Sequence, residues 1–290
     1  MKLLLKFSLI FLLVFGLGLA VAGWICYDFL QQNARNQVLQ QAKLMMAAAM
    51  SMRTYTTEQI RPIIDMRSRR EAFLPQTVPA YAATESFNYM RATYADYTYR
   101  EATLNPTNLR DRAVDWEVDV VNIFRNDPKR DEFSGERDAA NGRMLYLARP
   151  MRAAKSCLEC HSTPQAAPAS MIRFYGKTNG FGWKQDEVIG AQIVSVPMSV
   201  PVKMADDAYR RLMLSLVGVA ALTLLMLNIV LSWTVVRPVS RIAAAADAIS
   251  KGDMEVPELE DKGKDEIATL AQAFNRMYRS LKEAIRMLGQ

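Results

Sequence analysis

Two long apolar runs without any charged residue divide this chain. The first covers residues 7–27 and follows Lys2 and Lys6, and the second covers residues 212–236. At a rise of about 1.5 Å per residue, a helix of either length crosses a hydrocarbon core of roughly 30 Å. The pattern therefore predicts two transmembrane helices, at residues 7–29 and 212–236.

The segment between the two runs, residues 30–211, mixes helical and strand patterns. Residues 31–66 are rich in Ala, Gln and Met and contain no Gly or Pro before Pro62, which predicts a long helix continuing the first run. Apolar residues at helical spacing from Ala113 to Phe124 predict a second helix. Short apolar runs predict three strands, at residues 144–148, 171–175 and 188–196.

Turn residues separate these predicted elements. Phe133-Ser134-Gly135 and Asn141-Gly142 predict turns, Pro150 predicts the end of a strand, and a loop rich in Ser, Pro and Ala is expected up to Ser170. Helices and short strands in this order predict an α+β domain, in which a small antiparallel sheet is flanked by helices. Both ends of the domain enter the membrane, as in an extracytoplasmic PAS-like sensor domain.

After the second run, residues 237–288 show the pattern of a helical coiled coil. Apolar residues step by three and four from Val239 to Ile249, a connector with Gly252 follows, and a second helix opens at Asp265-Glu266. A helix pair with one apolar seam must pack against another chain to bury it, so a homodimer is expected. The seam of the second helix comprises Ile267, Leu270, Phe274, Met277, Leu281, Ala284 and Leu288.

The distribution of charge suggests an orientation. The chain carries 36 Lys and Arg against 30 Asp and Glu, a net charge of +6. Lys2 and Lys6 precede the first run, so the positive-inside rule places the N-terminus in the cytoplasm and residues 30–211 outside it. A cleaved signal peptide is the alternative, because Ala20-Val21-Ala22 resembles a cleavage site, but the apolar run continues through Cys26. No phosphate-binding loop or nucleic-acid motif appears, and no nucleic acid partner is expected.

Cys157-Leu158-Glu159-Cys160-His161 is the motif that carries chemistry. C-x-x-C-H is the attachment signature of a c-type haem, in which both thiols add to the haem vinyl groups and the imidazole becomes an axial iron ligand. His161 is the only histidine in 290 residues. The opposite axial position would then be held by Met or another group, or stay open.

Other readings of the motif remain open. A structural zinc site usually needs four Cys or His ligands, and only Cys157, Cys160 and His161 cluster here. A redox-active thiol pair would not require the histidine. Cys26, the third cysteine, lies in the first apolar run and is expected to act as a small buried hydrophobe.

Four residues are candidates for the surroundings of the iron. Met46 and Met50 share a helix face at i,i+4 spacing, and either could supply a thioether as the sixth ligand. Methionines that fill a core or a dimer interface are the alternative. Arg149 and Arg152 lie near the motif and could pair with haem propionates, or could be solvated surface charges.

Residues 236–288 resemble a HAMP linker domain, with a Pro after the membrane helix, a Gly in the connector and the Asp-Glu pair. The whole chain resembles bacterial membrane-anchored c-type haem sensors with a periplasmic PAS-like domain. The residues that carry this resemblance are Tyr55-Thr56 with Arg61-Pro62, Val78-Pro79-Ala80-Tyr81, Leu104-Asn105-Pro106-Thr107-Asn108, Ala148-Arg149-Pro150, Tyr175-Gly176, Gly180-Phe181-Gly182-Trp183 and Gly190-Ala191-Gln192.

The resemblance implies a sensor that binds haem c in the bacterial inner membrane, with a periplasmic haem domain and cytoplasmic termini. It would respond to redox state or to a diatomic gas and signal through the HAMP domain. Because the chain stops at Gln290, the output protein, of the kinase, cyclase or chemoreceptor type, is expected to be a separate polypeptide. No enzymatic activity is expected, since no second imidazole is present as a base. A membrane-anchored cytochrome for electron transfer is the alternative function.

Overall fold

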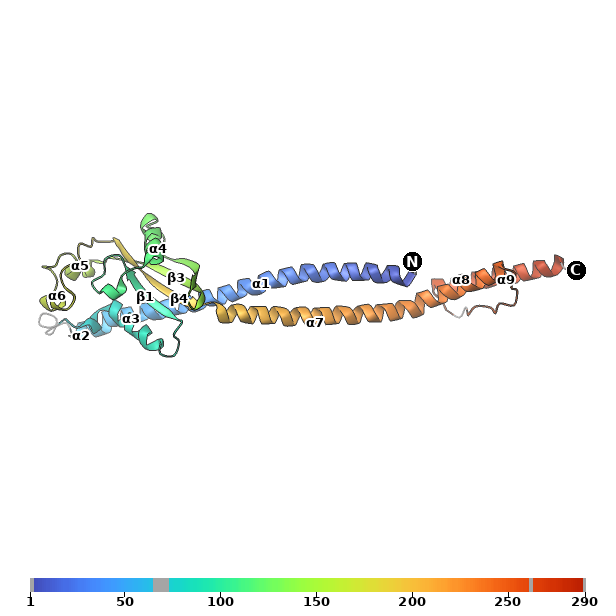
Figure 1. The fold of residues 1–290 in the computed structure, drawn as a ribbon, viewed down its shortest axis with the longest axis horizontal. Helices are drawn as coiled ribbons and strands as arrows, with labels where there is room; N and C mark the ends of the chain where they lie inside the picture. Colours follow the sequence, from blue (N-terminus) through green and yellow to red (C-terminus); the bar gives the residue numbers. More distant parts are fainter. Residues whose placement is uncertain (1–2, 65–72, 261–262, 289–290) are drawn as a thin grey trace. The chain divides into compact units, whose positions relative to one another are not determined.

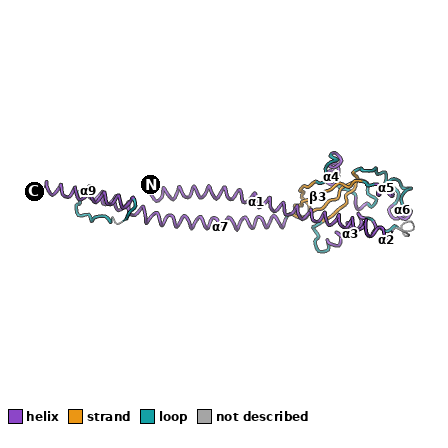
Figure 2. The backbone as a smooth tube through the Cα atoms, turned by 180° about the vertical axis from the view of Figure 1, so that it is seen from behind, coloured by secondary structure: helices purple, strands orange, loops and turns teal. Residues whose placement is uncertain are grey.

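The structure is a computed structural model that describes residues 3–64, 73–260 and 263–288. It divides into two units, Asp28–Ala208 and Met1–Tyr27 with Tyr209–Gln290. The fold class is α+β, as the sequence predicts. Figure 1 and Figure 2 show the small sheet, two long helices and the C-terminal helix pair.

Both apolar runs are helical. The first lies in α1 (Leu3–Tyr55) and the second in α7 (Ser199–Leu231) and the turn after it. Both helices are long and apolar enough to cross a membrane, and only 6% of the apolar window of each is buried, so neither is the core helix of a soluble domain. Both helices are therefore candidate membrane spans.

Four antiparallel strands form the sheet of the Asp28–Ala208 unit, in the order β1-β4-β3-β2. Strands β2, β3 and β4 form a meander, and β1 pairs with β4 from the other side. The first and last strands are thus neighbours, and β4 is buried along its whole length. The bounds are β1 (Thr98–Thr103), β2 (Phe133–Ala139), β3 (Gly142–Arg152) and β4 (Val188–Pro197).

Helices cover both faces of this sheet (Figure 1, Figure 2). On one face, Val38, Ala42 and Met46 of α1 pack with α3 (Pro79–Met90) against Leu145, Leu147, Val194 and Val196 of the strands. On the other face, α4 (Asp115–Asn126) packs Val120, Val121 and Phe124 against Ala102, Ala148, Ala191 and Ile193. The alternation of the strand side chains between these two clusters is what a sheet with both faces covered requires.

The remaining short elements surround one end of the sheet. Two helices follow β3, and they are joined to β4 by a glycine-containing loop. These elements are α2 (Arg61–Ile64), η2 (Pro75–Thr77), η3 (Leu109–Asp111), α5 (Lys155–His161) and α6 (Ala169–Tyr175).

Three predictions about the strands of the sheet and their turns were wrong. Residues 171–175 lie in helix α6 and not in a strand, because a short apolar run fits either state. The expected turn at residues 133–135 lies inside β2, where Gly135 leaves room for the ring of Tyr146 on β3. Pro150 does not end β3, because β2 pairs only as far as Ala148, so no strand requires the missing N–H on that side.

Two π-helical turns interrupt the long helices, and each is followed by Arg-Pro. The turn η1 (Thr56–Ile60) precedes Arg61-Pro62, and η4 (Ser232–Val236) precedes Arg237-Pro238. A proline has no N–H for the carbonyl four residues earlier, and its ring crowds that carbonyl. A wider turn before the proline relieves this crowding.

The C-terminal helices are α8 (Arg237–Ser250) and α9 (Glu266–Leu288). Ala245 and Ile249 of α8 pack with Phe274 and Tyr278 of α9. The connector between them is held by Asn275, whose amide group exchanges two hydrogen bonds with the backbone of Leu259, at 3.0 and 2.9 Å. Apolar connector residues Met254, Val256 and Leu259 complete this cluster.

Candidate functional site

The C-x-x-C-H motif forms the short helix α5, directly after strand β3, and not the loop that the sequence predicts. Cys157 and Cys160 stand three residues apart on this helix, so both thiols lie on the same side, and both are half-buried. Leu158 anchors the helix by packing, with Trp183, against Met151, Ala153 and Ile189. The strand thus positions the motif through an apolar contact.

The ring of His161 is held from two directions. Its Nδ1 lies 2.7 Å from the carbonyl oxygen of Gly180, and the hydroxyl of Thr107 lies 3.3 Å from the same nitrogen. The indole of Trp183 stacks on the imidazole, with centroids 4.1 Å apart and planes at 16°. Burial lowers the pKa of His161 below its usual 6.5, although the bond to the Gly180 carbonyl acts in the opposite direction. The imidazole is therefore neutral at physiological pH.

The loop that carries Gly180 is fixed by backbone and side-chain bonds. Asn105 accepts a hydrogen bond from the Gly180 N–H at 3.0 Å and donates to the Phe181 carbonyl at 3.3 Å. Farther along, the Gly182 N–H donates to Ser162 and the Trp183 N–H donates to His161, which caps the end of α5. The orientation of the histidine is thus set by the loop.

These residues fit a c-type haem. With Nδ1 donating its proton to a carbonyl, Nε2 keeps its lone pair for a metal, as in most histidine ligands. The two cysteines directly precede His161 in the sequence and lie on one side of the helix. Two thioether bonds to one haem require this arrangement. Within the described residues, no group of three His, Cys, Asp or Glu side chains is placed to hold a metal ion.

A buried charged network lies near the first thiol. The guanidinium of Arg53 on α1 pairs with Glu101 on β1, and the hydroxyl of Tyr99 donates to the same carboxylate at 2.7 Å. Burial lowers the pKa of Arg53, but the interactions with Glu101, Tyr99 and Cys157 raise it by more. The net pKa lies above its ordinary value, so Arg53 stays charged. A second cation, Arg61, lies 3.5 Å from Glu159 inside the motif.

The two arginines suggested by the sequence are engaged elsewhere. Arg149 donates to Glu132 at 3.0 and 3.3 Å. Arg152 donates to the Pro128 carbonyl at 2.8 Å and lies 3.6 Å from Asp131. Both guanidinium groups therefore hold the segment that leads into β2.

The two methionines differ in their surroundings. Met46 is fully buried in the cluster between α1 and the sheet. Met50 is half-buried and lies one helical turn before Arg53, the residue whose charge reaches Cys157. Of the two, Met50 is the nearer to the motif along the helix, and Met46 has the surroundings of a packing residue.

Sequence reasoning missed Arg53, Gly180 and Trp183 as parts of the site. No spacing rule links them to residues 157–161, because each comes from another element and meets the motif only in the folded domain. One sequence feature does point to this loop. In the run Gly180-Phe181-Gly182-Trp183, two glycines flank an aromatic residue, which is typical of a tight loop.

Comparisons with known proteins cover both parts of the chain. Residues 31–197 match the Tll0287-like family, and residues 230–283 match the HAMP domain. Among solved structures, the crystal structure of the cyanobacterial heme-protein Tll0287 matches with a TM-score of 0.44 and 17% identity, over 55% of this chain and 94% of that chain. A search of curated proteins found no significant match.

Proposed function

This chain belongs to the Tll0287-like family and carries a HAMP domain, and from this premise we propose that it is a transmembrane signal transducer with a covalent c-type haem outside the cytoplasm. The protein for which the family is named is described as a heme-protein. The observation that carries the proposal is His161, the only histidine, neutral and fixed through Nδ1 beside two thiols.

Each residue of the site has a role in this proposal. Cys157 and Cys160 would attach the haem, and His161 would bind its iron. The Gly180 carbonyl orients the imidazole and makes it more electron-rich, and Trp183 keeps its plane fixed. When bound, the haem supplies reversible one-electron redox chemistry and binding of diatomic gases. The residues of the chain around the haem would determine its reduction potential and the access of gases to the iron.

Met50 is our candidate for the sixth ligand, since Met46 packs in the core. Arg61 is better placed than Arg149 and Arg152 to interact with a haem propionate, because it lies 3.5 Å from Glu159 of the motif, and Arg53 adds a positive charge that acts electrostatically on Cys157. The buried Arg53–Glu101 pair joins α1 to β1, so a change of charge at the haem would act on α1 directly.

The orientation that we propose is supported by the distribution of charge. Lys2 and Lys6 favour a cytoplasmic N-terminus, which places residues 30–211 in the periplasm and the HAMP domain in the cytoplasm of a bacterial inner-membrane protein. A HAMP domain passes a signal to a downstream output domain. We propose that the output is a separate protein of the kinase, cyclase or chemoreceptor type, and that the chain itself is not an enzyme.

A pyridine haemochrome spectrum tests the proposal. Membranes from cells that express the protein with the cytochrome c maturation machinery should show haem that stays attached after acid–acetone extraction. The double variant Cys157→Ser, Cys160→Ser should lose it, and the matched control Cys26→Ser should keep it at the wild-type level. Wild-type protein without attached haem, or a double variant with as much as the wild type, would refute the proposal.

Electron transfer is the second candidate function, because a haem with two firm axial ligands suits it. The HAMP domain favours sensing, since an electron carrier does not need a signalling linker. Carbon monoxide added to the reduced membranes of the same experiment separates the two kinds of iron site. A rapid spectral change indicates an open or labile sixth position and gas sensing, whereas no change indicates firm ligation and either redox sensing or electron transfer.

A further inference from the structure

The sheet face that packs on α4 is only partly covered. The apolar residues of α4 reach the part of this face around Ala102, Ala148 and Ala191. Beside them lies a cavity of about 580 Å³, bounded by α3, β1, the start of α4 and the turn between β2 and β3. This volume lies within the range of about 300–1,000 Å³ that is typical of small-molecule sites. Its lining includes Thr98, Arg100, Trp116, Arg137, Ile193 and Ser195.

Arg137 is a cation of this cavity whose guanidinium is incompletely hydrogen-bonded. Its guanidinium lies over the ring of Trp116, 4.3 Å from the centroid, and Trp116 in turn packs on Tyr146. The Nε of Arg137 is buried, and it has no hydrogen-bond partner among the described residues. Stacking covers the face of the guanidinium but leaves its in-plane N–H without an acceptor. A buried donor in this state costs about 1–3 kcal/mol, so a ligand oxygen would be bound favourably once the side chain turns this N–H toward the cavity.

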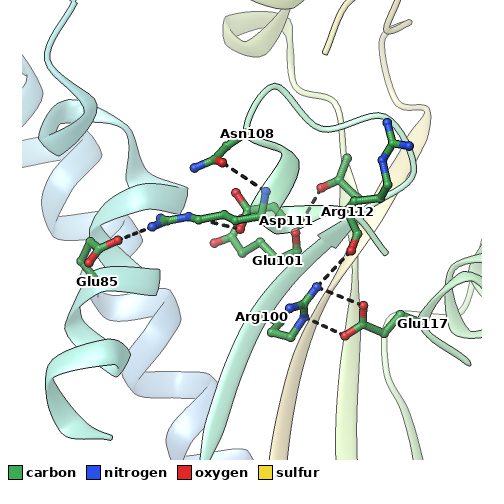
Figure 3. Close-up of polar contacts among 9 residues, drawn as sticks. Glu85, Arg100, Glu101, Asn108, Asp111, Arg112 and Glu117 are labelled. Atoms are coloured by element: carbon green, nitrogen blue, oxygen red, sulfur yellow. Dashed lines mark hydrogen bonds and ion pairs between the residues drawn. The ribbon is translucent and has the colours of Figure 1, made fainter. Parts of the chain in front are cut away.

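The other charges of the cavity are largely balanced. Figure 3 shows Arg100 bound by Glu117 and by the carbonyl of Arg112. The Arg100 Nε lies 2.8 Å from a carboxylate oxygen of Glu117, and a terminal nitrogen of Arg100 donates to the Arg112 carbonyl at 3.0 Å. Arg110 pairs with Glu85, and Asp96 accepts a hydrogen bond from Asn141. Within the described residues, Arg91, Arg137 and Asp96 line the cavity without an ion pair, which sets two positive charges against one negative charge. The uncompensated charge is therefore positive.

We propose that this cavity binds a small organic monocarboxylate. The carboxylate would accept hydrogen bonds from Arg137, with the hydroxyls of Thr98 and Ser195 beside it, and the carbon chain would lie against Ile193 and Met144. One negative charge fits better than two, because Asp96, Asp111 and Glu117 line the same cavity and would repel a dianion. The domain would then carry a second input, separate from the haem.

Isothermal titration calorimetry on the haem-loaded full chain in detergent tests this inference. The probes are acetate, lactate, benzoate and glycine, with phosphate and chloride as anion controls. At least one carboxylate should bind with a Kd below about 1 mM, and Arg137→Met should weaken it at least tenfold. The matched control Arg143→Met removes an exposed arginine that pairs with Glu136 outside the cavity, and it should bind like the wild type.

Two further measurements keep the test decisive. Arg137→Lys retains a cation over Trp116 but lacks the Nε–H, so its affinity should fall between those of the wild type and Arg137→Met. The Cys157→Ser, Cys160→Ser variant should bind the carboxylate normally, which separates this site from the haem. Binding by none of the four probes, equal binding by Arg137→Met, or equally tight phosphate binding would overturn the inference.

Discussion

Gly180 is the residue on which the geometry of the histidine depends most directly. Its carbonyl holds His161 Nδ1, and its backbone has a φ of +81°, which side chains rarely allow. A Cβ at this position would also lie 2.8 Å from the backbone of Thr107, too close for any real contact. Two independent constraints therefore reserve this position for glycine.

Gly180→Ala should lower the thermal midpoint and change the reduction potential of the haem, because the loop must shift away from Thr107 and the bond to His161 weakens. We expect a loss of about 2–4 kcal/mol. Gly182→Ala is the matched control, since Gly182 has a φ of +79° but no atom within 4 Å of its Cβ position. It should cost only about 1 kcal/mol and leave the potential unchanged. Equal effects of the two substitutions would contradict this account.

Asp111 should make stability depend on pH. Burial raises its pKa from 3.8 to about 6, although Arg110 and Arg100 oppose the shift. Between pH 3.8 and about 6 the folded protein keeps this proton and the unfolded chain releases it, so stability falls as pH rises through this window. Asp111→Asn should therefore raise stability by about 1–2 kcal/mol above pH 6 and change nothing below pH 3.8. Thermal midpoints from pH 3.5 to 8 measure this, and a benefit confined to low pH would disprove it.

At the scale of single residues, the sequence predicts which residues carry chemistry better than it predicts which residues they contact. The spacing of Cys157, Cys160 and His161 singles out the motif because the attachment reaction itself requires that spacing. The partners of His161 come from distant loops, and nothing in a local pattern indicates which loop will reach it. Arg149 was a candidate partner of the haem propionates because it is close to the motif in the sequence. In the folded domain it pairs with Glu132 instead.

At the scale of elements, strong periodicity predicted the long helices and the central strand correctly. The apolar runs, the heptad pattern and residues 188–196 all appear as predicted in type. The errors fall on short elements such as α6, where five apolar residues fit a helix or a strand. Strand β1 was not predicted, because Arg100 and Glu101 are polar and each finds a buried ion partner only in the fold.

The exposed side of α9 indicates how the HAMP domain completes its core. Phe274 and Tyr278 pack on α8, whereas Leu270, Met277 and Leu281 of the predicted seam are 47%, 56% and 39% exposed within one chain. An apolar stripe of this kind is buried when two HAMP helix pairs associate. We therefore expect the second chain to cover it.

Met277→Glu with Leu281→Glu should convert the protein from dimer to monomer, because the dimer would bury two unpaired carboxylates in each chain. Multi-angle light scattering in detergent measures the mass of the protein in the complex. Arg286→Glu adds negative charge at an exposed position away from the stripe and should leave the dimer intact. A dimer that survives the double substitution would show that another surface holds the two chains together.

At the scale of the whole molecule, the chain combines a Tll0287-like domain and a HAMP domain with two helices able to cross a membrane. Hydropathy alone predicts the two crossings, because the bilayer sets the length of an apolar helix. The proposed stimulus follows less directly from the sequence, since in our proposals it depends on the surroundings of the haem iron and on the cavity beside Arg137. The residues that line this cavity are far apart in the chain.

The π-helical turn before Arg237-Pro238 determines the direction in which the HAMP helix faces. Each residue of an α-helix advances by about 100°, and a π turn accommodates one additional residue. Side chains after Pro238 are therefore about 100° out of angular phase with a straight continuation of α7. This offset, and not the lipid-facing surface of α7, sets the direction in which the apolar stripe of α8 faces. A heptad register counted from the membrane helix into α8 would therefore be wrong by one position.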